Sequence, residues 1–398
     1  MLIARGARLV LALVLAFSAA LAGATSASAI TAPNWSGLDA RFYSGPPHGA
    51  GDLIRTVPLD PALSLPSAAA AYRFLYSTTN QHNHSAVGTA AVFTPKVAPP
   101  EGGWPVIAWA HGTVGLGDDC TPSAQPRSDR DAEYLSHWLD QGYAVVAADY
   151  VGLGTPGLMS YLNGVTTAHG IVDSVIAAHK MQLPLSPKWA VVGQSQGGAA
   201  AIDTARWATE FSAGSGLDFR GVVATGTPAN VASLIKQAGP NMPVPPNLDS
   251  IANAYTAYIV AALREARPDL DIDEALTPAG RAAADKAETL CVHDLADALA
   301  DMTVTGFFGS ELGSIPGFDE FVDAFMGTPQ SGFDRPIFLG VGLLDRDVPP
   351  EMTLTFHDQL VANGQDVTLK VYPDDDHSST VLASMADSTP FLLSVFAD

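Results

Sequence analysis

The amino-acid sequence predicts an α/β protein, with a mostly parallel central sheet, helices on both of its faces and an inserted helical cap. Three observations support this prediction. Short apolar runs alternate with helical segments of about 10–15 residues, as in parallel strands joined by helices. A Gly-x-Ser-x-Gly motif at 193–197 lies between one such strand and a helix. From 228 to 333 the alternation stops, and the sequence has helical periodicity with no convincing strand.

The predicted elements follow one another in a regular order. Residues 30–65 are rich in Pro and Gly and are interpreted as an arm that lies across the core. Two runs of β-forming residues then predict a strand pair, and strands alternate with helices after it. The predicted strands are 71–77, 85–94, 104–110, 143–148, 188–192, 220–224, 336–342 and 367–372, and the predicted helices are 131–141, 171–181, 198–207, 350–363 and a last one that ends near 396.

The interruption of this order predicts the domain organisation. We expect one sheet domain in two parts, 30–227 and 335–398, with residues 228–334 inserted between them as a cap. Within the insertion, apolar residues recur at four-residue steps and predict one face of a helix: Ile251, Tyr255, Ile259 and Leu263.

The first 29 residues predict a secretory signal peptide. Arg5 and Arg8 form a basic start, an apolar segment follows, and Ala27-Ser28-Ala29 is a small-residue cleavage site. An uncleaved N-terminal anchor is the alternative interpretation. No later segment holds the roughly 18 uninterrupted apolar residues that cross a bilayer. We therefore expect a secreted protein, cleaved after about Ala29 and without stable membrane insertion.

The net charge of the chain makes some classes of binding partner less favourable than others. The formal net charge is −21, and it falls to −23 without the two arginines of the signal peptide. Such an acidic surface disfavours binding to nucleic acid and to anionic membranes. It is consistent with a neutral substrate, although a charge that keeps an exported protein soluble is the simpler interpretation.

The two cysteines, Cys120 and Cys291, favour a disulfide, because oxidation is permitted in an exported chain. The bond would close a loop of 171 residues. On the chain-entropy relation such a bond contributes about 5 kcal/mol to stability, less any strain. The sequence has no metal-binding spacing of cysteines or histidines, and the pair His82 and His84 is interpreted as two surface histidines.

The Gly-x-Ser-x-Gly motif predicts a nucleophile elbow, a tight turn that presents a serine hydroxyl at the end of a sheet. A predicted strand precedes Ser195 and a predicted helix follows it. Gly193 and Gly197 have a steric explanation, because a side chain at either position would collide with the neighbouring strand or helix. We interpret Ser195 as a nucleophile. A structural glycine turn that happens to hold a serine is the alternative.

A serine nucleophile needs a base, and the base needs a partner that fixes its tautomer. In a fold with this elbow, an acid and then a histidine follow the serine along the chain, each after a late strand. His377 is the only histidine after a late strand and is the predicted base. Asp345 directly follows strand 336–342 and is the predicted acid, with Asp347 as the alternative. The three aspartates before His377 are interpreted as a solvated acidic turn.

The tetrahedral intermediate of acyl transfer carries a negative oxygen that needs N–H donors. The backbone N–H of Gln196, directly after the nucleophile, is one predicted donor. The second is the N–H of Thr113, which follows strand 104–110 in His111-Gly112-Thr113. An ordinary glycine turn is the alternative interpretation of this tripeptide.

Several short motifs occur in order along the chain: Tyr43 with Pro46-Pro47, then WAHGTVG at 109–115, CTPS at 120–123 and DYVGLG at 149–154, and then the elbow. From about residue 40 to the C-terminus, the chain resembles the secretory lipase family of the α/β-hydrolase superfamily, which includes fungal lipase A-like enzymes and actinobacterial secreted lipases. Two departures from the family are the glutamines on both sides of Ser195 and a divergent cap.

The resemblance implies hydrolysis of acylglycerols or simpler carboxylic esters, a helical cap over the site, no cofactor, and a disulfide that joins Cys120 to Cys291. Together with the residue predictions, it suggests a secreted serine ester hydrolase that works through an acyl-enzyme, with transient contact between its cap and a lipid interface. The alternatives are an acyltransferase, a serine peptidase of the same fold and a non-catalytic binding protein. Cap aromatic residues are candidates either for walls of the acyl site or for cap core: Phe307, Phe308, Phe318, Phe321 and Phe325.

Overall fold

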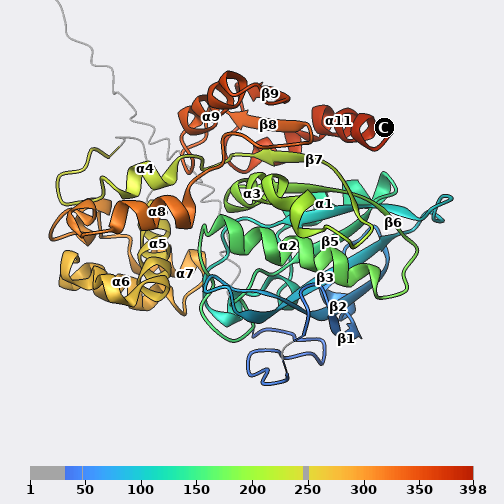
Figure 1. The fold of residues 1–398 in the computed structure, drawn as a ribbon, viewed down its shortest axis with the longest axis horizontal. Helices are drawn as coiled ribbons and strands as arrows, with labels where there is room; N and C mark the ends of the chain where they lie inside the picture. Colours follow the sequence, from blue (N-terminus) through green and yellow to red (C-terminus); the bar gives the residue numbers. More distant parts are fainter. Residues whose placement is uncertain (1–31, 47, 245–250, 398) are drawn as a thin grey trace, which may run out of the picture. The chain divides into compact units, whose positions relative to one another are not determined.

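The computed structural model describes residues 32–46, 48–244 and 251–397 of the chain. These residues form one nine-stranded sheet in the order β1-β2-β3-β5-β4-β6-β7-β8-β9 (Figure 1). The pairs β1–β2, β2–β3 and β3–β5 are antiparallel, and every pair from β5–β4 to β8–β9 is parallel. The predicted fold class, a mostly parallel sheet flanked by helices, is confirmed.

The strands are β1 (Leu53–Pro58), β2 (Ala68–Thr79), β3 (Ser85–Pro95), β4 (Trp104–Ala110), β5 (Ala144–Ala148), β6 (Leu185–Gln194), β7 (Asp218–Thr225), β8 (Ile337–Gly342) and β9 (Val367–Tyr372). All predicted strands are present, with ends that differ by a few residues. The interpretation of residues 30–65 as an arm alone is wrong, because it contains β1. Among the described residues, this edge strand pairs with β2 alone, and none of its residues is fully buried, so it lacks the apolar run of a buried strand.

The helices that flank the sheet are α1 (Asp129–Asp140), α2 (Gly164–His179), α3 (Gln196–Phe211), α9 (Pro350–Ala362), α10 (Ser379–Ala383) and α11 (Met385–Ala397). α2 begins well before the predicted residue 171. Its first turn is capped by Asn163, whose side-chain oxygen accepts a 2.9 Å hydrogen bond from the N–H of Thr166. The single helix predicted at the C-terminus is two helices, α10 and α11.

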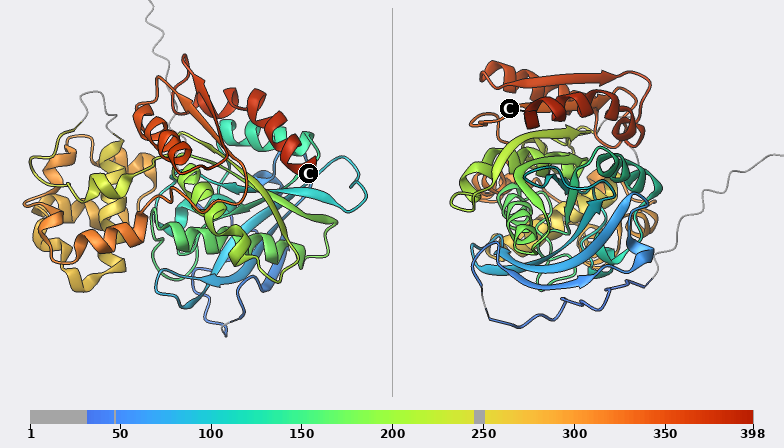
Figure 2. Two further views of the ribbon diagram at one scale, coloured as in Figure 1. Left: turned by 45° about the horizontal axis from the view of Figure 1, so that its top comes forward. Right: turned by 90° about the vertical axis from the view of Figure 1, so that its right-hand side faces the viewer.

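The flanking helices cover both faces of the sheet (Figures 1 and 2). α2, α3 and α9 pack on one face, and α1 and α11 pack on the other. Alternate residues of β4 show the two faces, since Val106 and Ala108 contact the first layer while Ile107 and Trp109 contact the second. β4 is therefore apolar on both sides, as is typical of a central parallel strand.

Between β7 and β8, the described residues contain helices and short 3-10 turns but no strand of the sheet. We call residues 228–334 the helical segment. Its helices are α4 (Val231–Ile235), α5 (Ala252–Ala266), α6 (Pro278–Ala287), α7 (Val292–Ala298) and α8 (Phe318–Met326). Figure 2 shows these helices in yellow and orange beside the sheet. In α5, the predicted apolar positions Ile259 and Leu263 are buried.

A disulfide between Cys120 and Cys291 joins the loop after β4 to the start of α7, so the predicted bond is present. Backbone contacts lie beside it. The N–H of Val292 donates to the carbonyl of Val114 at 2.9 Å. At Gly117, an added Cβ would lie 2.2 Å from the carbonyl oxygen of Thr289. The loop that carries Thr113 is therefore held tightly against the helical segment.

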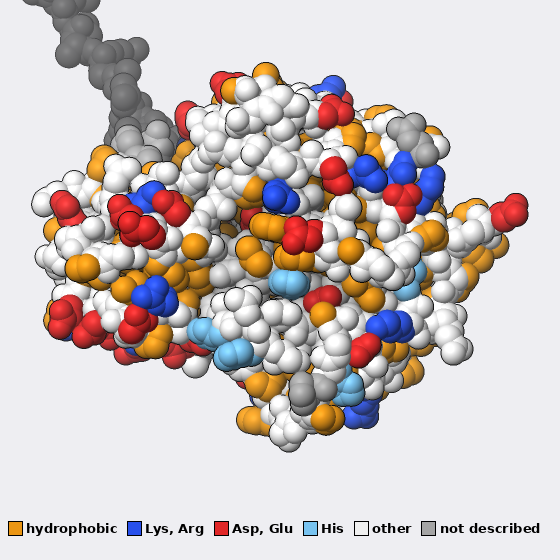
Figure 3. Space-filling view, viewed as in Figure 1, with side chains coloured by type: hydrophobic (Ala, Val, Ile, Leu, Met, Phe, Trp, Pro, Cys, Tyr) orange, Lys and Arg blue, Asp and Glu red, His pale blue; other side chains and the backbone are white. Residues whose placement is uncertain are grey.

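The described residues include no helix that is both long and apolar enough to cross a bilayer. The predicted signal peptide, residues 1–29, lies outside the described residues. On the face shown in Figure 3, acidic side chains gather over the helical segment at the left, in keeping with the net charge of −21.

Candidate active site

Ser195 lies in the tight turn between β6 and α3. Its backbone angles, φ 60° and ψ −128°, fall in a region that costs a residue with a side chain about 1–3 kcal/mol. The N–H of Ser195 donates to the carbonyl of Thr225 at 3.0 Å, which holds the turn against the end of β7. The strain presents the serine side chain at the end of the strand, as in a nucleophile elbow.

The glycines on either side of Ser195 are required by close packing. A Cβ added to Gly193 would lie 1.9 Å from the carbonyl oxygen of Gly197, in the first turn of α3. A Cβ added to Gly197 would lie 1.9 Å from the carbonyl oxygen of Ala110, at the end of β4. Because no side chain fits at either position, the steric explanation offered by the sequence agrees with the structure.

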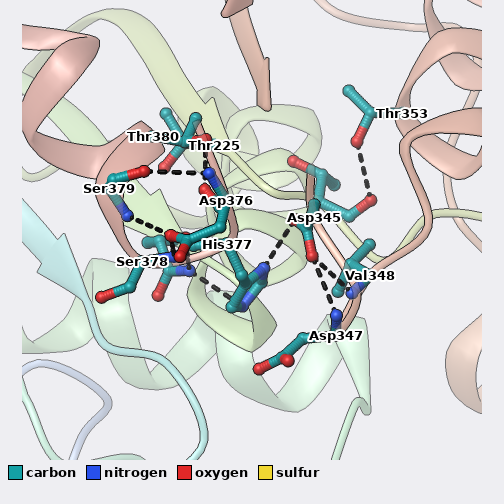
Figure 4. Close-up of polar contacts among 12 residues, drawn as sticks. Thr225, Asp345, Asp347, Val348, Thr353, Asp376, His377, Ser378, Ser379 and Thr380 are labelled. Atoms are coloured by element: carbon teal, nitrogen blue, oxygen red, sulfur yellow. Dashed lines mark hydrogen bonds and ion pairs between the residues drawn. The ribbon is translucent and has the colours of Figure 1, made fainter. Parts of the chain in front are cut away.

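Asp345 and His377 follow β8 and β9 and are in direct contact (Figure 4). The Nδ1 atom of His377 lies 2.7 Å from Oδ2 of Asp345. The other carboxylate oxygen, Oδ1, accepts hydrogen bonds from the N–H groups of Asp347 at 3.0 Å and Val348 at 2.8 Å. A carboxylate at Nδ1 requires a proton on that nitrogen, so Nε2 of the neutral imidazole is left as an acceptor.

The alternative acid, Asp347, is engaged by the helical segment. The hydroxyl of Tyr255 on α5 donates to Oδ2 of Asp347 at 3.1 Å. Burial, together with the charge of Asp347, raises the pKa of Tyr255 far above its ordinary value, so this hydroxyl remains a donor. The geometry therefore favours Asp345 over Asp347 as the partner of His377.

The turn before His377 has more structure than a solvated acidic turn. The side chain of Asp376 accepts hydrogen bonds from the N–H groups of Ser378 at 3.0 Å and Ser379 at 2.8 Å (Figure 4). Hydrogen bonds from the backbone and side chain of Ser379 lower the pKa of Asp376. Asp376 is exposed, but its carboxylate shapes the turn that carries the histidine into α10.

Gly226, directly after β7, leaves space for the aspartate–histidine pair. Its φ is +52°, and an added Cβ would lie 3.1 Å from both Nδ1 and Cε1 of His377 and 3.4 Å from Oδ2 of Asp345. Sequence reasoning missed this residue. A glycine at the end of a strand was the available signal, but it does not reveal which side chain occupies the space.

Gln194 contacts the nitrogen of His377 that a base would use. The side-chain Nε2 of Gln194 lies 2.9 Å from Nε2 of His377 and also donates to the carbonyl of His377 at 3.2 Å. Among the described residues, there is no hydrogen bond between Ser195 and His377. The amide of Gln194 therefore occupies the position that a serine hydroxyl takes in proton transfer. The sequence identified Gln194 only as a departure from a family pattern.

The two predicted oxyanion donors lie beside Ser195, since Gln196 and Thr113 line one cavity with it. Gln196 is the first residue of α3, so its N–H has no partner within the helix. The hydroxyls of Thr113 and Tyr161 are 2.6 Å apart. The structure thus brings both residues to the serine.

Two cavities meet at Ser195, and Thr113, Tyr255 and Asp347 also line both. The first, which we call the apolar cavity, has a volume of about 510 Å³. Its walls are mostly aliphatic and come largely from the helical segment, including Val231, Leu234, Ile235, Met242 and Ile259. Its size lies within the ~300–1,000 Å³ of small-molecule sites.

The second cavity, which we call the polar cavity, has a volume of about 690 Å³. Its walls include charged and hydroxyl side chains, among them Ser128, Arg130, Asp131, His293, Arg346 and Ser378. Gln194 and His377 line this cavity but not the apolar one. The two sides of Ser195 therefore differ sharply in chemistry.

The phenylalanines predicted in the cap were candidates either for walls of the acyl site or for cap core, and the structure shows both. Phe308 lines the apolar cavity. Phe307, Phe318 and Phe325 are buried in the core, and Phe321 packs against that core. Most of these phenylalanines therefore stabilise the helical segment, and aliphatic residues form most of the cavity wall.

The sheet, the elbow and the aspartate–histidine pair define a chain of the α/β-hydrolase fold. The model of the secretory lipase family matches residues 127–315, and that of the prolyl oligopeptidase family matches residues 319–397. A secreted triacylglycerol lipase of Malassezia globosa is 25% identical over 253 residues. That alignment covers 59% of this chain and 49% of the relative, so it spans about half of the relative's length.

Solved structures show the same fold. Lipase A of Candida antarctica in its closed state superposes with a TM-score of 0.69 and 20% identity, over 88% of this chain and 83% of that one. The rice cell wall degrading esterase LipA of Xanthomonas oryzae superposes with a TM-score of 0.68 and 18% identity, over 85% and 98%. The resemblance to the secretory lipases is confirmed, and the chain has the fold of these lipases and esterases.

Proposed function

We propose that the protein is a secreted carboxylic ester hydrolase that cleaves acylglycerols or simpler esters through an acyl-enzyme. One observation carries the proposal. His377, held by Asp345 at 2.7 Å, lines the polar cavity together with the elbow serine, Ser195, which also lines the apolar cavity. A base held in one tautomer beside a strained serine is the arrangement that acyl transfer requires.

In the proposed reaction, Ser195 attacks the ester carbonyl while Nε2 of His377 takes the hydroxyl proton. His377 then gives that proton to the leaving alcohol, and Asp345 holds the imidazole and stabilises its positive charge. The N–H groups of Gln196 and Thr113 stabilise the oxyanion. Water repeats the sequence at the acyl-enzyme and releases the carboxylic acid.

The acyl chain is assigned to the apolar cavity, because both proposed oxyanion donors line it and its walls are aliphatic. Burial of each methylene contributes about 0.8 kcal/mol, so the cavity favours medium or long acyl chains. The helical segment supplies most of these walls and acts as the cap in this proposal.

We further propose export of the chain, with its signal peptide ending near Ala29, and transient contact of the cap with a lipid interface. The secreted relative supports the export. Exposed apolar side chains at the two cavities support the contact, with Leu234 49% and Leu344 56% accessible.

The test is hydrolysis of p-nitrophenyl esters of increasing acyl length. We expect activity in the wild type and a loss of at least about 10⁴-fold in Ser195→Ala, because the nucleophile is absent. Ser233→Ala, an exposed serine on α4, is the matched control and should keep full activity. Absence of hydrolysis at every acyl length would contradict the proposal, as would full activity of a folded Ser195→Ala variant.

Product analysis distinguishes the proposed ester hydrolase from two other types of enzyme, an acyltransferase and a peptidase. An acyltransferase would share the acyl-enzyme but deliver the acyl group to a competing alcohol in preference to water. The family match at 319–397, which contains Asp345 and His377, suggests a peptidase as the second alternative. Cleavage of p-nitroanilides faster than of the matched esters would replace the esterase assignment by a peptidase.

A further inference from the structure

We propose that the polar cavity binds the leaving alcohol of the ester, that this alcohol is neutral and polyhydroxylated, such as glycerol or a sugar, and that Gln194 recognises it. The inference rests on the proposed ester hydrolysis and adds the class of alcohol to it.

The location follows from the proton that the leaving alcohol must receive. In acyl transfer the protonated base gives its proton to the departing oxygen, so the alcohol lies beside Nε2 of the histidine. His377 lines the polar cavity and not the apolar one, whereas Gln196 lines only the apolar one. An ester bound at Ser195 therefore directs its acyl chain into the apolar cavity and its alcohol into the polar cavity.

The walls of the polar cavity match hydroxyl groups. Ser128, His293 and Ser378 offer hydrogen-bond donors and acceptors from three separate parts of the chain. An alkyl alcohol would displace water from these groups without replacing its hydrogen bonds, and a site built for hydroxyl groups discriminates strongly against such analogues.

The charges in this cavity favour a neutral alcohol. The guanidinium of Arg130 is paired with Asp131 at 2.7 Å. Arg346 lines the same cavity as the carboxylates of Asp347 and Asp376. An anionic head group would meet these carboxylates, and the protein as a whole carries a net charge of −21. A neutral polyol avoids this repulsion and can pair with both signs of charge.

Gln194 connects alcohol binding to the chemistry. Its amide group is 2.9 Å from Nε2 of His377 and must leave that nitrogen before the imidazole can accept the proton of Ser195. Gln194 is 2% exposed, and a buried amide that loses its partner needs another one. A hydroxyl of the alcohol supplies it. A polyol ester therefore frees the base and pairs the displaced N–H of the amide, whereas an alkyl ester leaves that N–H unpaired.

The experiment compares two octanoate esters below their micelle-forming concentrations. 1-Monooctanoylglycerol and propyl octanoate share the acyl chain and the three-carbon alcohol skeleton, and they differ by two hydroxyl groups. We expect kcat/KM to be at least about 10-fold higher for the glycerol ester, the effect of one well-formed hydrogen bond. Hydrolysis of p-nitrophenyl octanoate is measured in parallel as a general test of ester hydrolysis.

Gln194→Met keeps the length of the side chain and removes its amide. We expect the ratio of the two kcat/KM values to fall towards 1, because the glycerol ester no longer has an amide to pair with. Arg346→Met should lower the ratio by a smaller factor. Leu234→Ala, in the apolar cavity, is the matched control and should lower both values by the same factor.

A wild-type ratio of 1 or less would overturn the alcohol assignment, and this measurement does not depend on the folding of any variant. A ratio unchanged in a folded Gln194→Met variant would overturn the role of Gln194. In both cases, hydrolysis of p-nitrophenyl octanoate would leave the proposed ester hydrolase standing. If none of the three esters is hydrolysed, the proposed function itself fails.

Discussion

The sheet and the helical segment contribute different things to the candidate active site. Loops at the ends of β6, β8 and β9 carry the proposed reactive groups Ser195, Asp345 and His377, and parallel register brings these loops to one edge of the sheet. The helical segment contributes aliphatic walls such as Leu234 and a contact from Tyr255 to Asp347. The comparison shows that the order and direction of the strands determine which reactive groups come together, whereas the helices determine the shape of the cavity beside them.

The largest expected effect separates the two aspartates of the loop after β8, since Asp345 contacts His377 whereas Asp347 contacts Tyr255 of the helical segment. Asp345→Asn should lower kcat about 10⁴-fold, because an amide at Nδ1 favours the wrong tautomer of His377. Asp347→Asn removes the charge that Tyr255 contacts and should lower kcat less than about 10-fold. Steady-state kinetics with a p-nitrophenyl ester measures both. Equal losses in the two variants would show that the assignment of the acid is wrong.

The disulfide is the covalent link between the two regions. Replacing both Cys120 and Cys291 by serine should lower the free energy of unfolding by up to about 5 kcal/mol, since the bond closes a loop of 171 residues. Urea unfolding of the oxidised wild type and the double variant measures the change. An unchanged unfolding midpoint would mean that the noncovalent contacts alone hold the loop of Thr113 to the helical segment.

A buried carboxyl on α2, which packs on the sheet, should make the free energy of unfolding depend on pH. Burial raises the pKa of Asp173 to about 7 in the folded protein, against about 3.9 when unfolded. The folded state therefore holds this proton more tightly. The stability that this tighter proton binding adds to the folded state is fully present below about pH 4. It is lost as the pH rises to about 7, which lowers the free energy of unfolding by about 4 kcal/mol.

Asp173→Asn should reduce this dependence of the free energy of unfolding on pH and leave the protein at least as stable as the wild type at pH 8, while Asp203, whose pKa burial raises to about 8, keeps its own share. Urea unfolding at pH 5 and pH 8 tests it, with the exposed Asp374→Asn as the control. A slope that persists unchanged in Asp173→Asn would assign the pH dependence to other groups.

The smallest expected effect tests the wall of the apolar cavity. Leu234→Trp adds bulk to this wall and should lower kcat/KM about 10-fold for a dodecanoate ester while leaving a butyrate ester unchanged. Leu393→Trp, at an exposed position on α11, is the control and should change neither. A parallel loss on both esters in Leu234→Trp would contradict the assignment of the acyl chain to this cavity.

The sheet was predictable because its strands have strong local signals. Buried runs such as 104–110 and the elbow at 193–197 are apparent from residue type and spacing, and the order serine, aspartate, histidine follows from strand-end positions. β1 was missed because an accessible edge strand such as Leu53–Pro58 has no buried face to produce an apolar pattern.

The contacts that refine the site could not be predicted, because each joins residues far apart in sequence. Gln194 reaches the imidazole of His377, and Tyr255 reaches Asp347, only through the packing of separate elements. Gly226 packs closely against a histidine 151 positions later, a contact that the sequence around the glycine does not reveal. Residue type indicated that reactive groups would follow the strands, but not which neighbours would touch them.

Covalent labelling of the serine tests the central claim most directly. An alkyl fluorophosphonate transfers its phosphonyl group to an activated serine with loss of fluoride, and mass spectrometry of the intact chain and its peptides locates the adduct. We expect one adduct per chain, on Ser195, formed far more slowly in Asp345→Asn. A folded protein that forms no adduct, or that is labelled elsewhere while Ser195 stays unmodified, would contradict the claim that Asp345 and His377 activate this serine.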